Sequence, residues 1–171
     1  MSTIDRATDA GAVKNRETAP ERVESKGSLT AFVIAAALSL VGLADALYLT
    51  VQHVAGRSVR CTVITGCDEV LASPYAVLPG GVPLAALGAL AYFAVFSLAT
   101  LAAFGYGWAR APLAVLVALM LATTLGLLYL QAFILEKFCE FCLLSAAVTL
   151  SLAVVLIAKR RLRGDDGGAH G

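Results

Sequence analysis

The chain has 171 residues, of which 59% are hydrophobic and only 15% are charged. A typical soluble domain has roughly 25% charged residues, so this composition excludes an ordinary globular enzyme and a disordered protein. The formal net charge is +1, and the sequence presents no basic face of the kind that binds nucleic acid. The length corresponds to one domain with short tails.

Four apolar stretches are long enough to cross a membrane, which takes about 20 predominantly apolar residues. They comprise residues 29–51, 82–104, 113–135 and 141–158. Asp45 is the only charged residue within them. The pattern predicts an all-α, multi-pass membrane protein, a bundle of four transmembrane helices over residues 28–160 that is surrounded by membrane lipid. Residues 1–27 and 161–171 have little apolar surface to bury, so we expect disordered tails.

Basic residues predict the orientation of this bundle. Four of them directly follow the last apolar stretch: Lys159, Arg160, Arg161 and Arg163. Others lie in the N-terminal tail, and Arg110 lies in the connection between the second and third stretches. We expect the protein in the cell inner or plasma membrane. Because positive charge stays on the cytoplasmic side, we expect both of its termini in the cytoplasm. The loop 52–81 and the turn 136–140 then lie on the extracytoplasmic face.

All four cysteines fall on this predicted outer face. Cys61 and Cys67 lie in the loop sequence CTVITGC, and Cys139 and Cys142 lie in FCEFC, at the start of the fourth stretch. Disulfides form and persist on the extracytoplasmic side. A cysteine at a helix start also feels the helix dipole, which lowers its pKa and makes the thiolate a better nucleophile.

The two pairs lie at two depths, and this predicts a relay by thiol–disulfide exchange. The loop pair can meet a soluble protein, whereas Cys142 lies one turn deeper, where a lipid-soluble oxidant can reach it. Two alternatives stay open. The loop pair can be a static disulfide, and four cysteines can bind zinc, although C-x₅-C fits the usual C-x₂₋₄-C knuckle poorly. We therefore expect no metal site. The rival to an enzyme is a non-catalytic membrane protein with a structural loop disulfide and a metal-binding or packing C-x-x-C.

The loop continues from its second cysteine through Ser73 into an S-P-Y-A element and a G-x-P element, and the fourth stretch opens with C-x-x-C. Together with the loop cysteines, these motifs resemble the vitamin K epoxide reductase family, in the bacterial form without a fused thioredoxin domain. The resemblance covers about residues 28–160. It implies a four-helix bundle around a quinone, with a short cap helix after the loop cysteines.

The resemblance also implies a reaction. Electrons would pass from an extracytoplasmic thioredoxin-fold (DsbA-like) protein, through the two cysteine pairs, to menaquinone or ubiquinone, and this would support disulfide formation in secreted proteins. Cys61 would exchange with the partner, and Cys67 would form the transient bridge to Cys139. Cys142 would react with the quinone, by attack or charge transfer, and Ser73 would help to order the cap.

Two positions depart from the family pattern. Members that reduce vitamin K often have an asparagine at the start of the second span and a tyrosine four residues after the last cysteine, and both can hydrogen-bond quinone carbonyls. Leu84 and Ala146 occupy these positions here, with Ser145 adjacent. The lost donors argue against epoxide reduction but leave the thiol chemistry intact. Tyr92 is a further candidate for the pocket.

Asp45 is a candidate functional residue, because an acid at membrane depth is costly. One interpretation makes it an interfacial acid that pairs with a loop base, Arg57 or Arg60. The other assigns it to a proton relay that protonates the reduced quinone.

Overall fold

The structure is a computed structural model that describes residues 3–59, 67–78 and 80–165. The predictions that concern Cys61 and Arg60 lie outside the described residues.

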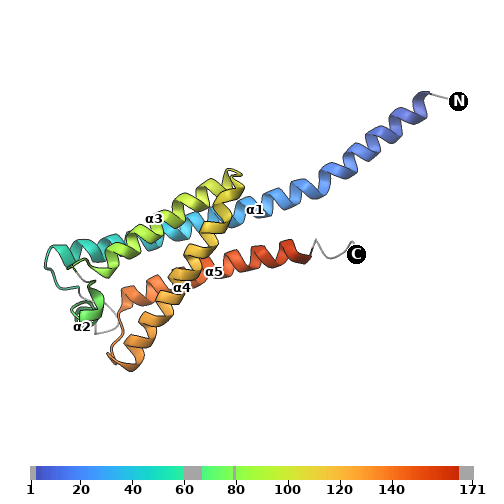
Figure 1. The fold of residues 1–171 in the computed structure, drawn as a ribbon. Coiled ribbons are helices and arrows are strands. Elements are labelled where there is room, and N and C mark those ends of the chain that lie inside the picture. Colours follow the sequence, from blue (N-terminus) through green and yellow to red (C-terminus); the bar gives the residue numbers. More distant parts are fainter. Residues whose placement is uncertain (1–2, 60–66, 79, 166–171) are drawn as a thin grey trace.

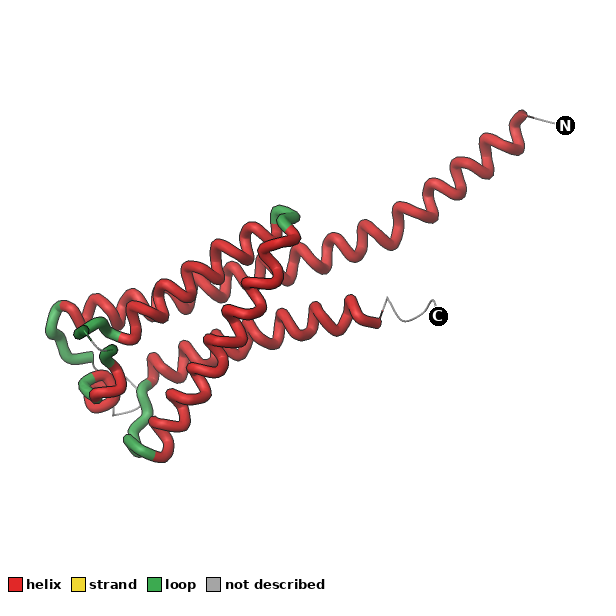
Figure 2. The backbone as a smooth tube through the Cα atoms, in the orientation of Figure 1, coloured by secondary structure: helices red, strands yellow, loops and turns green. Residues whose placement is uncertain are grey.

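Four long helices dominate the described part of the chain (Figures 1 and 2). They are α1 (Thr3–Val54), α3 (Leu84–Ala103), α4 (Arg110–Phe133) and α5 (Glu140–Asp165). Segments long and apolar enough to cross a membrane cover Gly27–Val54, Leu84–Ala103, Gly107–Phe133 and Glu140–Arg161. These segments confirm the predicted four-helix, all-α membrane fold. No strand is present among the described residues, which contain only an isolated bridge between Val77 and Pro83.

Local sequence determines where the helices begin and end. Pro83 lies at the N-cap of α3, where its missing N–H costs nothing. The chain leaves α3 at Gly105, whose φ of 94° favours glycine. Pro112 falls in the first turn of α4, the part of a helix that tolerates proline. Each boundary lies near the end of an apolar stretch, which explains why the sequence predicts the spans well.

The four helices form a bundle in which α1 packs along α3 and α5, and α4 packs against α5 and α3. Both termini lie at one end of this bundle (Figure 1). The short helix α2 (Cys67–Leu71) and the connection from α4 to α5 lie together at the other end. The fold therefore brings Cys67 to the same end of the bundle as Cys139, although they are distant in sequence.

Side-chain size differs between the inside and the outside of the bundle. Alanines that are almost fully buried line the helix contacts, including Ala35, Ala99 and Ala102. Large apolar side chains such as Leu90 and Phe93 instead lie more than half exposed on the outer surface. Small residues allow close helix packing within a bilayer, where large apolar groups face lipid at no cost. This arrangement fits a bundle surrounded by hydrocarbon.

Two helices extend beyond the predicted spans. Helix α1 begins at Thr3, and the disorder that composition predicts for residues 1–27 stays a prediction. The first half of α1 projects beyond the other helices (Figure 1). Extending an existing helix avoids the cost of nucleation, so a polar segment can continue an apolar helix without tertiary contacts. In the same way α5 continues to Asp165, and residues 166–171 lie outside the description.

Candidate active site

A compact cap follows Cys67. It consists of α2 and a 3₁₀ turn, Pro74–Ala76. Ser73 joins the two: its buried hydroxyl donates a hydrogen bond to the Val70 carbonyl at 2.6 Å, and its own carbonyl accepts one from Ala76 N–H at 3.0 Å. Ser73 thus hydrogen-bonds to both parts of the cap, and its role in ordering the cap stays a prediction.

The first cysteine of the C-x-x-C lies in the same buried cluster as the loop cysteine Cys67. Cys67 is 1% exposed and disulfide-bonded, while Cys139 and Cys142 are free thiols. In this state Cys67 is oxidised and the C-x-x-C pair is reduced. Cys67 and Cys139 belong to one buried cluster with Leu49 and Val70 from α1 and the cap. The structure brings together the two cysteines that a relay would bridge.

Cys139 lies directly before α5 and is fully buried. A hydrogen bond from the Cys142 side chain, with further ones from the N–H groups of Cys142 and Phe141, lowers the pKa of Cys139 to about 7. Burial and the negative charge of Asp45 oppose this effect. The direction agrees with the expectation for a thiol at a helix start. Near neutral pH a large fraction of Cys139 is therefore thiolate.

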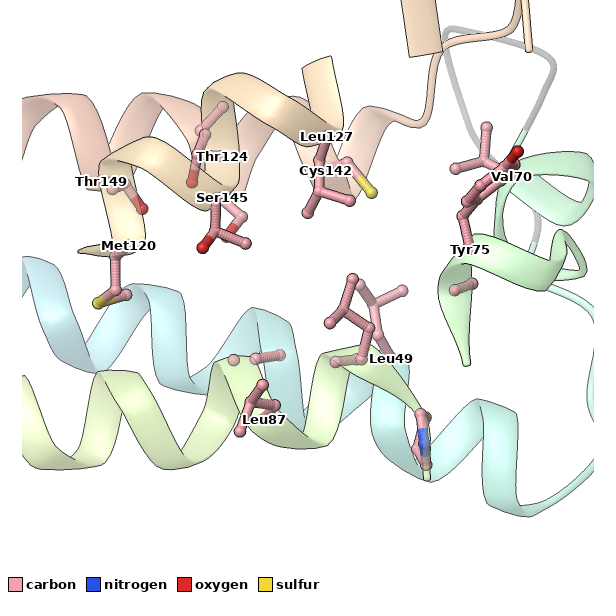
Figure 3. A pocket seen from close by; sticks show the side chains of 18 of the residues that line it. Leu49, Val70, Tyr75, Leu87, Met120, Thr124, Leu127, Cys142, Ser145 and Thr149 are labelled. Carbon is pink, nitrogen blue, oxygen red and sulfur yellow. The ribbon is translucent and has the colours of Figure 1, made fainter. Parts of the chain in front are cut away.

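A cavity of about 370 Å³ lies between the helices beneath the cap. Figure 3 shows Cys142, Ser145 and Thr149 of α5 along one side, with Val70 and Tyr75 of the cap at one end. Ser73, Leu84, Tyr92, Ala146 and Cys142 all line it. The volume and the mostly apolar lining are those of a small-molecule site with a few polar contacts. A flat apolar ring such as a quinone fits these properties.

Tyr92 ties α3 to α5 at this cavity. Its ring is 1% exposed, and its hydroxyl lies 3.0 Å from the Ser145 carbonyl, 2.8 Å from Ser145 Oγ and 2.9 Å from Thr149 Oγ1. The hydroxyls of Tyr92, Ser145 and Thr149 each have one proton to donate, and the three contacts use all three protons. In this arrangement no hydroxyl proton remains to donate to a ligand. Tyr92 therefore shapes the cavity, and Gly42 makes room for its ring, because a Cβ at position 42 would collide with it.

Asp45 lies beside the cysteine pair but does not line the cavity. The residue is 8% exposed, and neither carboxylate oxygen has a hydrogen-bond partner among the described residues. Pairing with Arg57 is thus not formed, and Arg60 lies outside the described residues. The charge of Asp45 acts on both Cys139 and Cys142.

Sequence reasoning missed Gln131, at the end of α4. Its side chain is 2% exposed and lines the cavity. Its Oε1 accepts a hydrogen bond from Cys139 N–H at 3.3 Å, and its side chain also hydrogen-bonds Cys142. The sequence does contain a clue to Gln131, because it is the single residue with a side-chain amide within the apolar stretch 113–135. A polar group at membrane depth usually has a function or a partner.

In the described part of the chain, no three His, Cys, Asp or Glu residues gather as a metal site. In a comparison with known protein families, residues 33–157 match the model of the Vitamin K epoxide reductase family. The match spans Cys67, Cys139 and Cys142 and includes most of every apolar helix. Family members are oxidoreductases that are in general linked to quinones. The chain therefore belongs to the vitamin K epoxide reductase family and is a multi-pass membrane oxidoreductase.

Proposed function

We propose that this protein takes electrons from an extracytoplasmic thioredoxin-fold protein and passes them through its two cysteine pairs to a membrane quinone. One observation carries the proposal. Cys67 and Cys139 share a buried cluster, and Cys142, one helical turn further along α5, lines an apolar cavity. The sulfur atoms are thus arranged from the loop toward a site for an apolar acceptor.

The proposed reaction consists of three exchanges of two electrons each. A partner dithiol reduces the loop disulfide of Cys61 and Cys67 and becomes a disulfide itself. The loop dithiol then reduces an oxidised Cys139–Cys142 pair through a transient Cys67–Cys139 bond. Finally the Cys139–Cys142 dithiol gives two electrons and two protons to the quinone, which leaves as hydroquinone while the C-x-x-C disulfide forms.

The lowered pKa of Cys139 supports the middle exchange. When Cys61 attacks Cys67 in the transient bridge, Cys139 is the leaving group. A thiol of lower pKa leaves faster, and the pKa of Cys139 is about 7. The intermediate would therefore resolve toward the loop disulfide, with the electrons on the C-x-x-C pair.

The cavity supports a lipid-soluble acceptor. Leu87 of α3 and Leu119 of α4 line it, and both are at least half exposed on the outer, apolar surface of the bundle. A quinone could thus enter from the bilayer. Leu84 and Ala146 offer no hydrogen-bond donor to it, so we propose a quinone rather than vitamin K epoxide as the substrate. Whether menaquinone or ubiquinone is used depends on which the membrane supplies.

We assign two supporting roles. Ser73 would order the cap through its hydrogen bond to Val70. Asp45 would take up a thiol proton as the pair is oxidised and pass it on to the reduced quinone, because its buried carboxylate oxygens have no partner in the described part of the structure. Asp45→Asn should then slow the quinone-reduction step several-fold without changing the rate at which a partner protein reduces the loop. Stopped-flow measurement of the two half-reactions separates these rates, and an unchanged quinone step would remove Asp45 from the relay.

The whole proposal is tested with the purified protein in detergent, a reduced thioredoxin-fold partner and a short-chain quinone, whose absorbance reports turnover. Cys67→Ala and Cys142→Ala should each abolish turnover. Ser151→Ala, on the outer surface of α5, is the matched control and should be active. Absence of turnover in the unmodified protein, together with an inert loop disulfide, would favour the non-catalytic alternative.

A further inference from the structure

Gln131 accepts two main-chain hydrogen bonds from the segment that leads into the C-x-x-C. Its main-chain carbonyl accepts a hydrogen bond from Lys137 N–H at 3.2 Å, and its side-chain Oε1 accepts one from Cys139 N–H at 3.3 Å. Both contacts lie in the connection that leads from α4 into α5. The position of Cys139 is therefore determined by a side chain of the preceding helix as well as by α5.

The Gln131 side chain also has a hydrogen-bonding group that can contact Cys142. A glutamine offers one carbonyl oxygen and an NH₂ group with two protons. Since Oε1 faces an N–H donor, the amide orientation is fixed, and the NH₂ group is the part available to Cys142. Gln131 thus contacts both members of the C-x-x-C, the main chain of one and the thiol of the other.

This contact matters most when Cys142 is a thiolate. When a Cys67 thiolate attacks Sγ of Cys139, the Cys67–Cys139 bond forms and the Cys139–Cys142 bond breaks. The electron pair of the broken bond stays on Cys142. Cys139 is then bonded to Cys67 and has no thiol proton to share. An unpaired anion inside an apolar cavity is costly, and the amide N–H of Gln131 remains beside it.

We propose that Gln131 is a positioning residue of the relay, which fixes Cys139 through its carbonyl oxygen and stabilises the Cys142 thiolate through its amide N–H. The proposal rests on the proposed function for its purpose, since a thiolate at Cys142 is needed only if the pair exchanges electrons. The contacts themselves do not depend on which partner or quinone is used.

The test uses neither quinone nor partner protein. In a Cys139→Ala variant with the loop disulfide intact, Cys142 is the free thiol, and its alkylation rate against pH reports how readily it becomes a thiolate. Adding Gln131→Leu should move the midpoint of this profile to higher pH and lower the rate at neutral pH about tenfold, the size expected for a hydrogen bond to a charged group. Thr124→Val, which alters another cavity-lining residue of α4, is the matched control and should leave the profile unchanged.

Gln131→Glu, added to the same Cys139→Ala parent, provides a second variant with nearly the same shape. Its carboxyl group still accepts the main-chain N–H bond at position 139, but when ionised it places a negative charge beside Cys142 instead of a donor. Alkylation relative to the parent should therefore be slowed at alkaline pH and recover toward acidic pH, where the carboxyl group is protonated and can donate. Equal rates and midpoints for the parent, Gln131→Leu and Gln131→Glu would overturn the proposal. Because the assay lacks quinone, a failure of the proposed function would not imitate that result.

Discussion

Gly42 of α1 packs against the ring of Tyr92 of α3, and Tyr92 lines the cavity. A Cβ at position 42 would collide with the Tyr92 ring, which is held by contacts to Ser145 and Thr149 and cannot turn aside freely. Gly42→Ala should therefore destabilise the protein by about 1–3 kcal/mol, the usual cost of overpacking a core. Thermal unfolding in detergent measures the effect. Gly126→Ala is the control, since no atom lies within 4 Å of its added Cβ, and equal unfolding temperatures for the two variants would contradict the prediction.

The Cys139 thiol should titrate near neutral pH. Its pKa is lowered from 9.0 to about 7, so the thiolate predominates above that pH and the neutral thiol below it. The ultraviolet absorbance of its thiolate should rise through about pH 7 in the protein with its loop disulfide intact. This readout requires no reagent to reach the buried sulfur. Cys142→Ala removes the largest cause of the lowering and should move the midpoint upward. A midpoint near 9 in the unmodified protein would show that these hydrogen bonds do not stabilise the thiolate.

Some residues could be predicted from the sequence and others could not. The cysteine motifs and Ser73 are recognisable as patterns, because their spacing is local. Gln131 has a local signal, its polarity within an apolar stretch, but its contact with Cys139 depends on how α4 turns into α5. The clearance between Gly42 and Tyr92 depends on the packing of α1 against α3, which a single sequence does not reveal.

At the scale of the elements, an ion pair joins the cap to the α4–α5 connection. Lys137 Nζ lies 3.1 Å from Glu69 Oε2. Glu69 follows Cys67 by two residues, and Lys137 precedes Cys139 by two residues. Exposed pairs of this kind contribute little to the free energy of unfolding. Their placement indicates that this one aligns the two cysteine-bearing segments.

Lys137→Glu should therefore slow the formation of a Cys67–Cys139 disulfide about two- to fivefold, while the unfolding temperature stays nearly constant. The measurement uses a Cys61→Ala, Cys142→Ala background, in which these are the two remaining cysteines, and follows the disulfide on non-reducing gels after addition of an oxidant. Exchanging the charges with Glu69→Lys and Lys137→Glu should restore the rate. High salt should remove the difference, and a swap that restores nothing would exclude an aligning role.

The boundaries of the apolar helices were predicted closely because hydropathy and helix-ending residues coincide, as at Pro83 and Gly105. The disorder of the N-terminal tail stays a prediction, because composition reports only whether a segment can bury surface. It does not report whether the segment can extend a neighbouring helix.

For the whole molecule, the placement of both termini at one end (Figure 1) makes the proposed orientation testable at a single site. The basic residues after the last span predict that this end is cytoplasmic. A green fluorescent protein fused to the C-terminus should therefore fluoresce. This reporter does not fold when the bacterial Sec pathway exports it, so fluorescence reports a cytoplasmic C-terminus. Alkaline phosphatase at the same position should be inactive. The opposite pair of results would invert the topology and place the cysteines in the cytoplasm.

Cys67 and Cys139 meet in an apolar cluster that excludes water, with 1% and 0% of their surfaces exposed. Thiol–disulfide exchange requires access to the sulfur that is attacked. In the proposed relay, small soluble thiols, even at high concentration, would therefore have no direct path to the bond between Cys67 and Cys139. Only a molecule that engages the loop would then deliver electrons to the quinone. The burial of the cluster that holds both cysteines would thus protect a membrane's oxidising capacity from consumption by the bulk thiols around it.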